Sequence, residues 1–518
     1  MDKFAKIALE QYNDEANLIR PGDVGGKNFW NLNSMQFIFV PSFQFPRIPA
    51  AESYEFTATD CNGKTHTFSA KSPTAPLTPI WKDIPSGMVE LKVEAIHSLN
   101  KNKYLVGART FYKAAYFPGR EALPEKACSY KECAIKALDY AFNSPASQYW
   151  LIHGKPDPDY YHNVYPSKMI PSLVKAMTAY AELKPEMAEK AMKLATNAAD
   201  YLLSITYGAD TAVEGLPPTY SFDGLNKEIV DATAPMADCR KHQIMLIYPP
   251  RVGIMYLKLE KLTGDKKYFD AACKIAEYYK NNVLPNGSWY LLVSKDNNQP
   301  ESNNCCGTFD ILAFLSEFYK RTGEECWHEL EKGYFDYILK TRYETFNWEG
   351  QFEDIQLSGN LVNLTHFIAG DFIEYINKNL SDNEEMVNIA KELLRFVEDQ
   401  FVVWDGFAPW SDHKPEGVKW YSPAAMEQYF WYVPIDSSTA ALINDFLYVY
   451  EITKDELLLE KACALGDSIT RMQDKESGVI PTHWMKEDCT ENLENFWINC
   501  HIHTGFTMMK LAKATGEI

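Results

Sequence analysis

Two patterns of hydrophobic and polar residues divide the chain. Between residues 30 and about 118, segments such as SYEFTATD, THTFSAKS and MVELKVEAIH alternate polar and apolar residues with a period of two, and the turn-forming stretches CNGK and DIPSG separate them. This alternation is typical of β-strands with one buried face. From about residue 131, apolar residues recur at three-and-four spacing, which is typical of helices. The patterns predict a small β-sandwich domain at 1–118 and a helical domain at 131–518.

The stretch FPGREALPEKACSY separates the two regions. It contains two prolines and shows neither period. Prolines without periodicity are typical of connecting segments. We therefore predict a linker at residues 119–130.

The helical region contains a repeat. LTGDKKYFDAACKIAEYYKNNV begins at 262, RTGEECWHELEKGYFDYILK at 321 and ITKDELLLEKACALGDSITRM at 452, and each is a tight turn followed by a helix. The final ATGEI is the opening of another copy, whereas KECAIKALDYAFN at 131–143 resembles a repeat body without its turn. A repeat that is cut in this way predicts that the two ends of the region close a ring.

Counting the periodic segments gives twelve helices, which pair into six hairpins. The predicted helices are 131–143, 166–183, 186–205, 245–262, 266–283, 307–322, 325–341, 360–379, 384–402, 436–452, 455–472 and 498–515. Connections within hairpins are short, whereas those between hairpins span 144–165, 206–244, 284–306, 342–359, 403–435 and 473–497. Long loops are costly to order and are kept mainly for function, so we expect the working surface on the face that they form.

This hairpin pattern over residues 131–518, with a small β domain before it, resembles the six-hairpin glycosidase superfamily. These (α/α)6 toroids include unsaturated glucuronyl hydrolases, β-glucuronidase-type members and related uronate-acting enzymes. The resemblance implies a mainly α protein, an (α/α)6 toroid that degrades glycans in a cleft on the long-loop face. The expected partner is an oligosaccharide, with no cofactor implied, and assembly into a homo-oligomer stays open.

Composition narrows the class of partner. Of the 518 residues, 46% are hydrophobic and 23% charged, which is the balance of a folded globular protein, and the net charge of -19 argues against nucleic acid as the main ligand. No apolar stretch is long enough to span a membrane. The opening MDKFAKIALEQYNDE lacks the apolar core of a secretory signal, so a cytoplasmic location is expected unless a leader has been removed.

Glycosidic bonds are usually cleaved by two carboxyl groups, one that donates a proton and one that activates water or attacks. In MEQYFWYVPID, Glu427 stands among aromatic residues, and such surroundings favour the protonated form of an acid. In WEGQFEDIQ, Glu353 and Asp354 lie in an aromatic, glycine-containing context. We predict Glu427 as proton donor and Glu353 or Asp354 as base or nucleophile, the alternative for such acids being a helix cap or a loop contact.

Other long-loop residues are predicted to bind the sugar. Aromatic rings can stack on it, Arg can pair with a carboxylate, and Asp436 has a competing role as a helix cap. The arginine candidates are Arg251 and Arg240, and for both of them structural ion pairing is the alternative. The predicted binding residues are His153, Asp157, Tyr161, His162, Tyr220, Arg251, Trp404, Trp431, Asp436, His483 and Trp484.

Two alternatives keep the same loop face. In one, a uronate-directed lyase or C5-epimerase uses Tyr161, His162 and His483 to move the proton next to a carboxylate. In the other, the chain binds glycans without catalysis. The adjacent Cys305 and Cys306 fit no closed Cys/His ligand set, so no metal is predicted, although similar toroids of some β-L-arabinofuranosidases carry zinc on cysteines and a glutamate.

Overall fold

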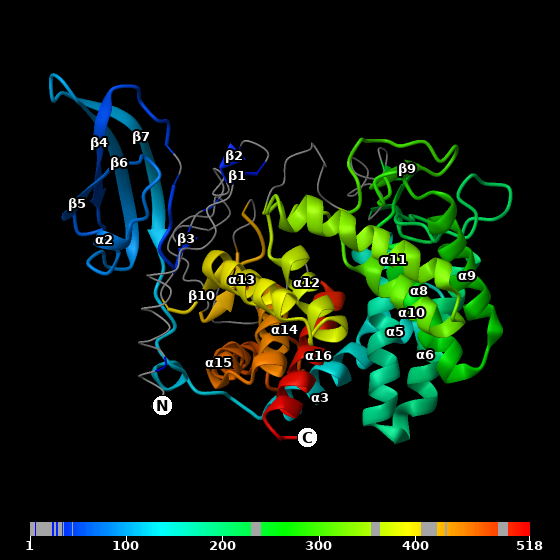
Figure 1. The fold of residues 1–518 in the computed structure, drawn as a ribbon. Coiled ribbons are helices and arrows are strands. Elements are labelled where there is room, and N and C mark those ends of the chain that lie inside the picture. Colours follow the sequence, from blue (N-terminus) through cyan, green and yellow to red (C-terminus); the bar gives the residue numbers. More distant parts are fainter. Residues whose placement is uncertain are drawn as a thin grey trace.

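The computed structural model describes residues 6, 23–24, 27–28, 34, 36–43, 45–228, 240–353, 363–405, 422–429, 433–484 and 496–518 (Figure 1). Within these ranges, no helix combines the length and the hydrophobicity that crossing a membrane requires. A mixed sheet lies at one side of the molecule and the helices form the larger part (Figure 1). The expected class, mainly α with a small β region ahead of it, is confirmed.

The sheet has five strands in the order β3-β7-β6-β4-β5. β3 pairs with β7 in parallel and the other pairs are antiparallel. The strands are β3 (Gln36–Phe37), β4 (Ala51–Thr59), β5 (Thr65–Ala70), β6 (Gly87–His97) and β7 (Lys103–Lys113), and the short helix α2 (Thr78–Trp81) lies beside β5. A separate pair, β1 (Asp23–Val24) and β2 (Lys27–Asn28), precedes them.

The period-two segments correspond to β4, β5 and β6, but the second layer of the expected sandwich is not among the described strands. One face of the sheet packs on a small aromatic core in which Phe37 contacts Phe43 and Phe111 at ring-centroid distances of 5.3 and 5.6 Å. In β6, buried positions alternate with more exposed ones. An alternating pattern indicates that one face of a strand is buried, but it does not indicate what covers that face. Here a segment without regular secondary structure and α2 cover it.

Each of the twelve expected helices is present (Figure 1). The outer helices are α3 (Tyr130–Asn143), α6 (Ala188–Ser204), α9 (Lys266–Asn281), α11 (Glu325–Ile338), α13 (Glu384–Phe401) and α15 (Glu456–Met472). The inner helices are α5 (Pro166–Leu183), α8 (Pro249–Thr263), α10 (Asp310–Thr322), α12 (Phe367–Asn379), α14 (Asp436–Thr453) and α16 (Ile498–Ala514).

The inner helices close a ring. α16 packs on α5, α5 on α8 and α8 on α10, while α12 packs on α14 and α14 on α16. Phe309, just before α10, stacks on Phe372 of α12 at 4.8 Å and completes the circle. Outer and inner helices alternate along the chain, so all six inner helices begin on the face that carries the long connections.

The repeated turns share one backbone geometry. Gly264 and Gly323 end α8 and α10 with φ values of 73° and 72°, in the left-handed region that glycine enters at little cost. Lys454 holds the same place after α14 with φ of 57°. Asp265 and Asp455 then cap the next helices by accepting the backbone N–H of Lys267 and Leu457.

The predicted closure between the ends of the helical region is confirmed by contacts between α3 and α16. His501 Nε2 lies 2.8 Å from the carbonyl oxygen of Ala137. Gly505 permits this approach, because a Cβ there would stand 3.1 Å from the Ala137 side chain.

The sheet is docked on the ring beside α13 (Figure 1). Gln36 donates to the Val402 carbonyl at 2.7 Å, and Gln400 donates back to the Gln36 carbonyl at 3.0 Å. Asp399 Oδ1 accepts the backbone N–H of Ile38 and of Phe39, both at 2.7 Å. Val402–Val403 (β10) also pairs with Ala424–Ala425 (β11).

The long connections contain short elements of their own. α4 (Pro145–His153) lies in the first of them, where the sequence predicts only loop. The long connections or their ends also hold η2 (Tyr161–Val164), the π-helical turn η4 (Leu339–Tyr343), and the paired strands β8 (Gln243–Met245) and β9 (Leu292–Ser294). Two further short helices lie elsewhere: η1 (Arg120–Ala122) in the linker and η3 (Pro185–Met187) in the turn between α5 and α6. Proline at the first position starts both α4 and α5, because its missing N–H is not needed there.

Candidate functional site

Two neighbouring inner helices begin with the same short pattern. α5 starts after Tyr165 with Pro166 and carries Lys168, and α8 starts after Tyr248 with Pro249 and carries Arg251. A cation in the first turn of a helix is unfavourable, because the exposed N–H groups make that end positive. Each of these cations therefore needs an acidic partner.

The partner of Lys168 is Glu353, from the connection between α11 and α12. The Glu353 carboxylate is 1% exposed, with Lys168 Nζ on Oε1 and the hydroxyl of Tyr248 on Oε2. Tyr220 donates its hydroxyl to the Glu353 carbonyl at 2.8 Å. Burial alone would raise the pKa of Glu353, but Lys168 and the hydrogen bonds hold that pKa below its ordinary value. Glu353 is therefore an ionised carboxylate at neutral pH.

The partner of Arg251 is Asp310 at the start of α10. Arg251 Nε lies 2.7 Å from Asp310 Oδ2, and the guanidinium stands 5.4 Å from the centre of the Tyr248 ring. The Arg251 side chain keeps 39% of its accessible surface. Tyr248 contacts both Arg251 and Glu353, so the predicted arginine lies near the Glu353 carboxylate. Its side chain remains accessible to a ligand.

An aromatic stack covers one side of the Lys168–Glu353 pair. Trp497, which precedes α16, stacks on His162 at 3.6 Å with an interplanar angle of 23°. Lys168 Nζ lies 4.5 Å from the centre of the Trp497 ring, and Tyr165 lies parallel to that ring at 5.9 Å. Burial, helped by the charges of Lys168 and His483, lowers the pKa of His162 to about 3, so its imidazole is neutral at ordinary pH.

A pair of carboxyl groups, Glu427 and Asp436, lies where α14 begins. Asp436 is fully buried and accepts the Ser437 N–H at 2.7 Å and the Thr504 hydroxyl at 3.1 Å. Burial raises the pKa of Asp436 well above its usual range, against these hydrogen bonds, and the charge of the half-buried Glu427 adds to the rise. These effects favour the protonated form of Asp436 in the Glu427–Asp436 pair. Asp436 is the first residue of α14 and not its N-cap, which is Ile435, although the Asp436 carboxylate accepts an N–H of the first turn.

Cys500, in the first turn of α16, connects the two acidic groups. Burial and the charge of Asp436 raise the pKa of its thiol, which also responds to Lys168 and Glu427. Lys168, the partner of Glu353, and the Glu427–Asp436 pair therefore lie within electrostatic range of one side chain. We call these residues the Lys168 cluster: His162, Lys168, Tyr220, Tyr248, Glu353, Glu427, Asp436, Trp497 and Cys500.

Other predicted residues border this cluster. His483 pairs by a β-bridge with Ile435, directly before α14, and burial lowers the pKa of the His483 imidazole. Tyr161 touches the His162 ring at 4.8 Å. The guanidinium of Arg240 lies 5.9 Å from the Tyr220 ring centre.

Two predicted tryptophans belong to the core and not to a ligand surface. Trp404 is 1% exposed, donates its indole N–H to Glu398 at 2.9 Å and packs on Phe117 at 4.7 Å. Trp484 is fully buried and donates to the Pro481 carbonyl at 3.0 Å. Sequence position in a long loop did not reveal that these rings close the core under the loops.

His153 and Asp157 also fall outside the cluster. His153 ends α4, is exposed and stacks on Tyr149 at 4.3 Å. Asp157 builds its own loop, accepting the Asp159 N–H at 3.0 Å. Asp354 and Trp431, which were also predicted, lie outside the described residues.

The cysteine pair has its own surroundings. The Cys306 thiol is buried and donates to the Tyr290 carbonyl at 3.5 Å, and the Cys305 thiol lies 3.9 Å from the Asn303 carbonyl. In the part of the chain that the structure describes, no three His, Cys, Asp or Glu side chains come together as a metal site would require.

The sequence analysis missed Lys168 and Tyr248, which hold Glu353. A signal was present, because both belong to the Tyr-Pro starts of α5 and α8. A lysine in a first helical turn is itself a sign of a nearby acid. What the sequence could not supply was which acid, since Glu353 is far away along the chain.

Several solved structures are distantly similar to this chain. A family 76 glycoside hydrolase from a bovine Bacteroides thetaiotaomicron strain matches with 12% identity and a TM-score of 0.46, over 92% of this chain and 99% of that one. A cellobiose 2-epimerase from Spirochaeta thermophila gives 12% identity and 0.46, over 74% and 98%. An unsaturated glucuronyl hydrolase specific for heparin gives 11% identity and 0.43, over 75% and 97%.

No family model matches the sequence. No curated protein matches it either. Since the structural matches are distant and carry different activities, a function has to be inferred from the side chains of this chain.

Proposed function

We propose that the chain is a carbohydrate-active enzyme that hydrolyses the glycosidic bond at the end of an oligosaccharide, with a uronic acid as one candidate sugar. Glu427 is the proton donor and Glu353 is the base or nucleophile. One observation supports the proposal: Lys168, which binds the Glu353 carboxylate, and the Glu427–Asp436 carboxyl pair all act on one side chain, Cys500, while the pKa of Glu353 is lowered and that of Asp436 is raised. Two carboxyl groups in different protonation states are what glycosidic cleavage requires.

The surroundings support a sugar ligand. Trp497 is a half-buried ring of the kind on which a sugar face stacks, with the buried Tyr165 parallel to it, and Arg251 offers a planar donor for a carboxylate. Glu353 is held by Lys168 and Tyr248 on its two oxygens, so a ligand reaches it only if one of these partners moves. The base therefore becomes available on substrate binding.

The test is a screen of neutral and uronate-containing oligosaccharides with analysis of products, followed by Glu427→Gln and Glu353→Gln. Each variant should lose most turnover. The melting temperature of Glu427→Gln should stay close to that of the wild type, whereas Glu353→Gln leaves Lys168 without its counter-charge and should lower it. Glu344→Gln is a matched control, because Glu344 lies in the same connection as Glu353 but is exposed. Full turnover in either of the first two variants would contradict the assignment.

A second candidate is elimination or epimerisation at the carbon next to a carboxylate. The observation that favours it is His162, a neutral imidazole, 2% exposed, whose Nδ1 has no hydrogen-bond partner among the described residues. A neutral imidazole can accept a proton from carbon. His483 lies within electrostatic range and would act with it.

Product analysis separates the two reactions. Elimination gives an unsaturated sugar that absorbs in the ultraviolet, epimerisation gives an isomer of the substrate, and hydrolysis gives two saturated sugars. His162→Gln should abolish the first two but lower hydrolysis only through lost stacking. Tight oligosaccharide binding with no product after long incubation would favour a glycan-binding protein instead.

A further inference from the structure

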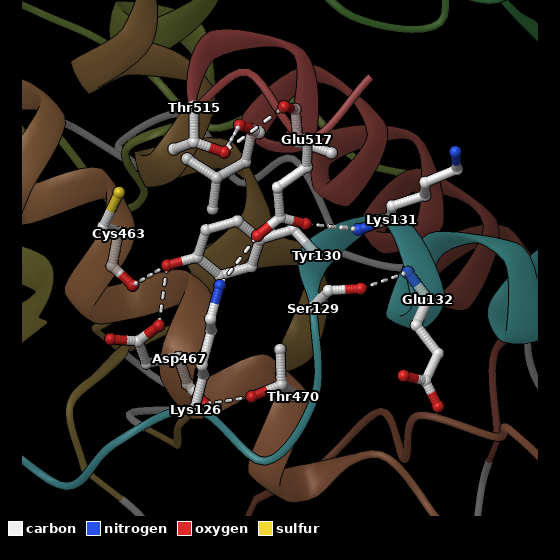
Figure 2. A network of polar contacts seen from close by, with 12 residues as sticks. Lys126, Ser129, Tyr130, Lys131, Glu132, Cys463, Asp467, Thr470, Thr515 and Glu517 are labelled. Atoms are coloured by element: carbon white, nitrogen blue, oxygen red, sulfur yellow. Dashed lines mark hydrogen bonds and ion pairs between the residues drawn. The ribbon is translucent and has the colours of Figure 1, made fainter.

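The first helix of the ring begins with a side-chain cap. Ser129 precedes α3, and its hydroxyl accepts the backbone N–H of Glu132 at 3.1 Å, as Figure 2 shows. In helices of this kind, the residue before the cap packs against the fourth helical residue. Those two positions, usually apolar, are occupied here by Cys128 and Cys133.

The two thiols face each other. The staple positions of one capped turn bring these two side chains together, the pKa of each thiol is shifted mainly by the other thiol, and both cysteines are reduced in the structure. Cys133 is fully buried, whereas Cys128 is half-buried and within reach of a small reagent. The contact with Cys133 lowers the pKa of the Cys128 thiol, and the nearby Lys136 and Lys126 add to this, which favours its thiolate.

The backbone around these thiols is fixed on the side of α15 (Figure 2). The hydroxyl of Tyr130 lies 2.6 Å from Asp467 Oδ1 and 3.2 Å from the Cys463 carbonyl. The N–H of Ala127 donates to the Thr470 hydroxyl at 2.9 Å. The residues before and after Cys128 are therefore anchored to one helix.

The C-terminus fixes the same segment from another direction (Figure 2). Glu517 accepts the Lys131 N–H at 3.0 Å and pairs with Lys126 Nζ at 2.7 Å. This carboxylate bridges the last residues of the chain and the start of α3. The two thiols thus stand at the seam where the ends of the ring meet, and little conformational freedom remains to be lost when they are joined.

We propose that Cys128 and Cys133 form a reversible disulfide that locks the start of α3, by exchange with a small disulfide such as oxidised glutathione. The Cys128 thiolate attacks one sulfur of that disulfide, forms a mixed disulfide and releases one glutathione thiolate. The contact with Cys128 and burial raise the pKa of the Cys133 thiol, so Cys133 passes its proton to the released glutathione thiolate as it attacks Sγ of Cys128, forms the internal disulfide and releases the second glutathione thiolate. Two protein thiols are oxidised, one glutathione disulfide is reduced to two thiols, and no other oxidant is needed.

The structural effect follows from the position of the pair. α3 and α16 are the first and last helices of the ring, so opening the ring at its seam separates the start of α3 from Glu517 and α15. A covalent link between Cys128 and Cys133 keeps the first turn and its cap formed in the opened state. Oxidation should therefore make the seam more resistant to heat.

The sequence permits a direct test on the full chain. After equilibration in mixtures of reduced and oxidised glutathione and blocking of free thiols, trypsin cleaves after Lys126, Lys131 and Lys136. The disulfide then links the peptides 127–131 and 132–136, which otherwise separate. We expect this linked pair to increase with the fraction of oxidised glutathione, and the melting temperature to rise with it.

Cys128→Ser is the test variant, and Cys61→Ser is the matched control at an exposed cysteine outside the ring. The control should form the linked peptides and show the thermal shift, and Cys128→Ser should show neither. Absence of the linked pair at every glutathione ratio would overturn the proposal. So would a thermal shift of equal size in Cys128→Ser.

Discussion

Lys168 and Glu353 form a buried ion pair between the first turn of α5 and the connection that precedes α12. The pair joins two parts of the ring that are distant in sequence, and it leaves the lysine over Trp497 and the carboxylate on Tyr248. A buried pair of this kind is costly to break, because the remaining charge stays without its counter-charge. The proposed base is therefore also part of the fold.

Lys168→Met should lower the free energy of unfolding by about 3–5 kcal/mol, since it leaves the Glu353 carboxylate buried without a cation. Lys168→Met combined with Glu353→Gln should recover most of that loss, because no unpaired charge remains. Denaturant unfolding of the two variants and the wild type provides the comparison. Equal stability of the single and double variants would show that the ion pair has no net effect on folding.

The end of α13, together with Ser34, holds the segment that carries Glu427. Tyr429, two residues later, donates its hydroxyl to Gln400 at 2.9 Å and stacks on Phe401 at 5.3 Å. Ser34 reaches the same hydroxyl at 3.5 Å. Tyr429→Phe leaves the Gln400 oxygen without this donor, at a cost of about 1–3 kcal/mol, and should lower kcat more than it changes KM.

The control for this variant is Tyr319→Phe, since the Tyr319 hydroxyl contacts Glu325 at an exposed position. It should leave both constants unchanged. Steady-state kinetics on the substrate found in the screen give the comparison. A change in KM alone for Tyr429→Phe would mean that the ring contacts sugar and does not position Glu427.

The local sequence pattern was sufficient to predict the helices and the closure of the ring. The turn LTGDKK specifies its own geometry, because Gly264 takes the left-handed conformation and Asp265 caps the next helix, both within a few residues. The position of Trp404 could not be predicted from the local pattern. Its loop position suggested a ligand surface, but Glu398 and Phe117 enclose it, and a partner such as Phe117 comes from the other side of the predicted linker.

His501 gives a pH dependence with a defined sign. Its Nε2 faces the Ala137 carbonyl, and its Nδ1 accepts the Ile480 N–H at 3.2 Å, which only a neutral ring can do. Burial lowers its pKa from the ordinary 6.5 to about 4. A depressed histidine pKa means that the unfolded chain binds the proton first, so the stability from this group is present above pH 6.5 and is lost as the pH falls toward 4.

The wild type should therefore lose about 2 kcal/mol between pH 7.5 and pH 5 from this group, and His501→Gln should not. The destabilisation caused by the substitution should be smaller at pH 5 by that amount. His328→Gln is the control, because the His328 side chain is 49% exposed and should show no such change. A constant difference between the wild type and His501→Gln over this range would contradict the neutral state of the ring.

Lys454 is a lysine in a place where the other copies of the turn have glycine. Its φ of 57° lies in the left-handed region, which costs a residue with a Cβ about 1 kcal/mol or more, whereas Gly264 and Gly323 adopt it freely. Lys454→Gly should raise the free energy of unfolding by roughly 0.5–1 kcal/mol after the entropy of glycine in the unfolded chain is subtracted. Gly323→Ala, the mirror substitution, should lower it by a similar amount. Thermal or urea unfolding measures both, and destabilisation by Lys454→Gly would mean that contacts of the lysine side chain, such as its cation–π contact with Tyr450, outweigh the backbone strain.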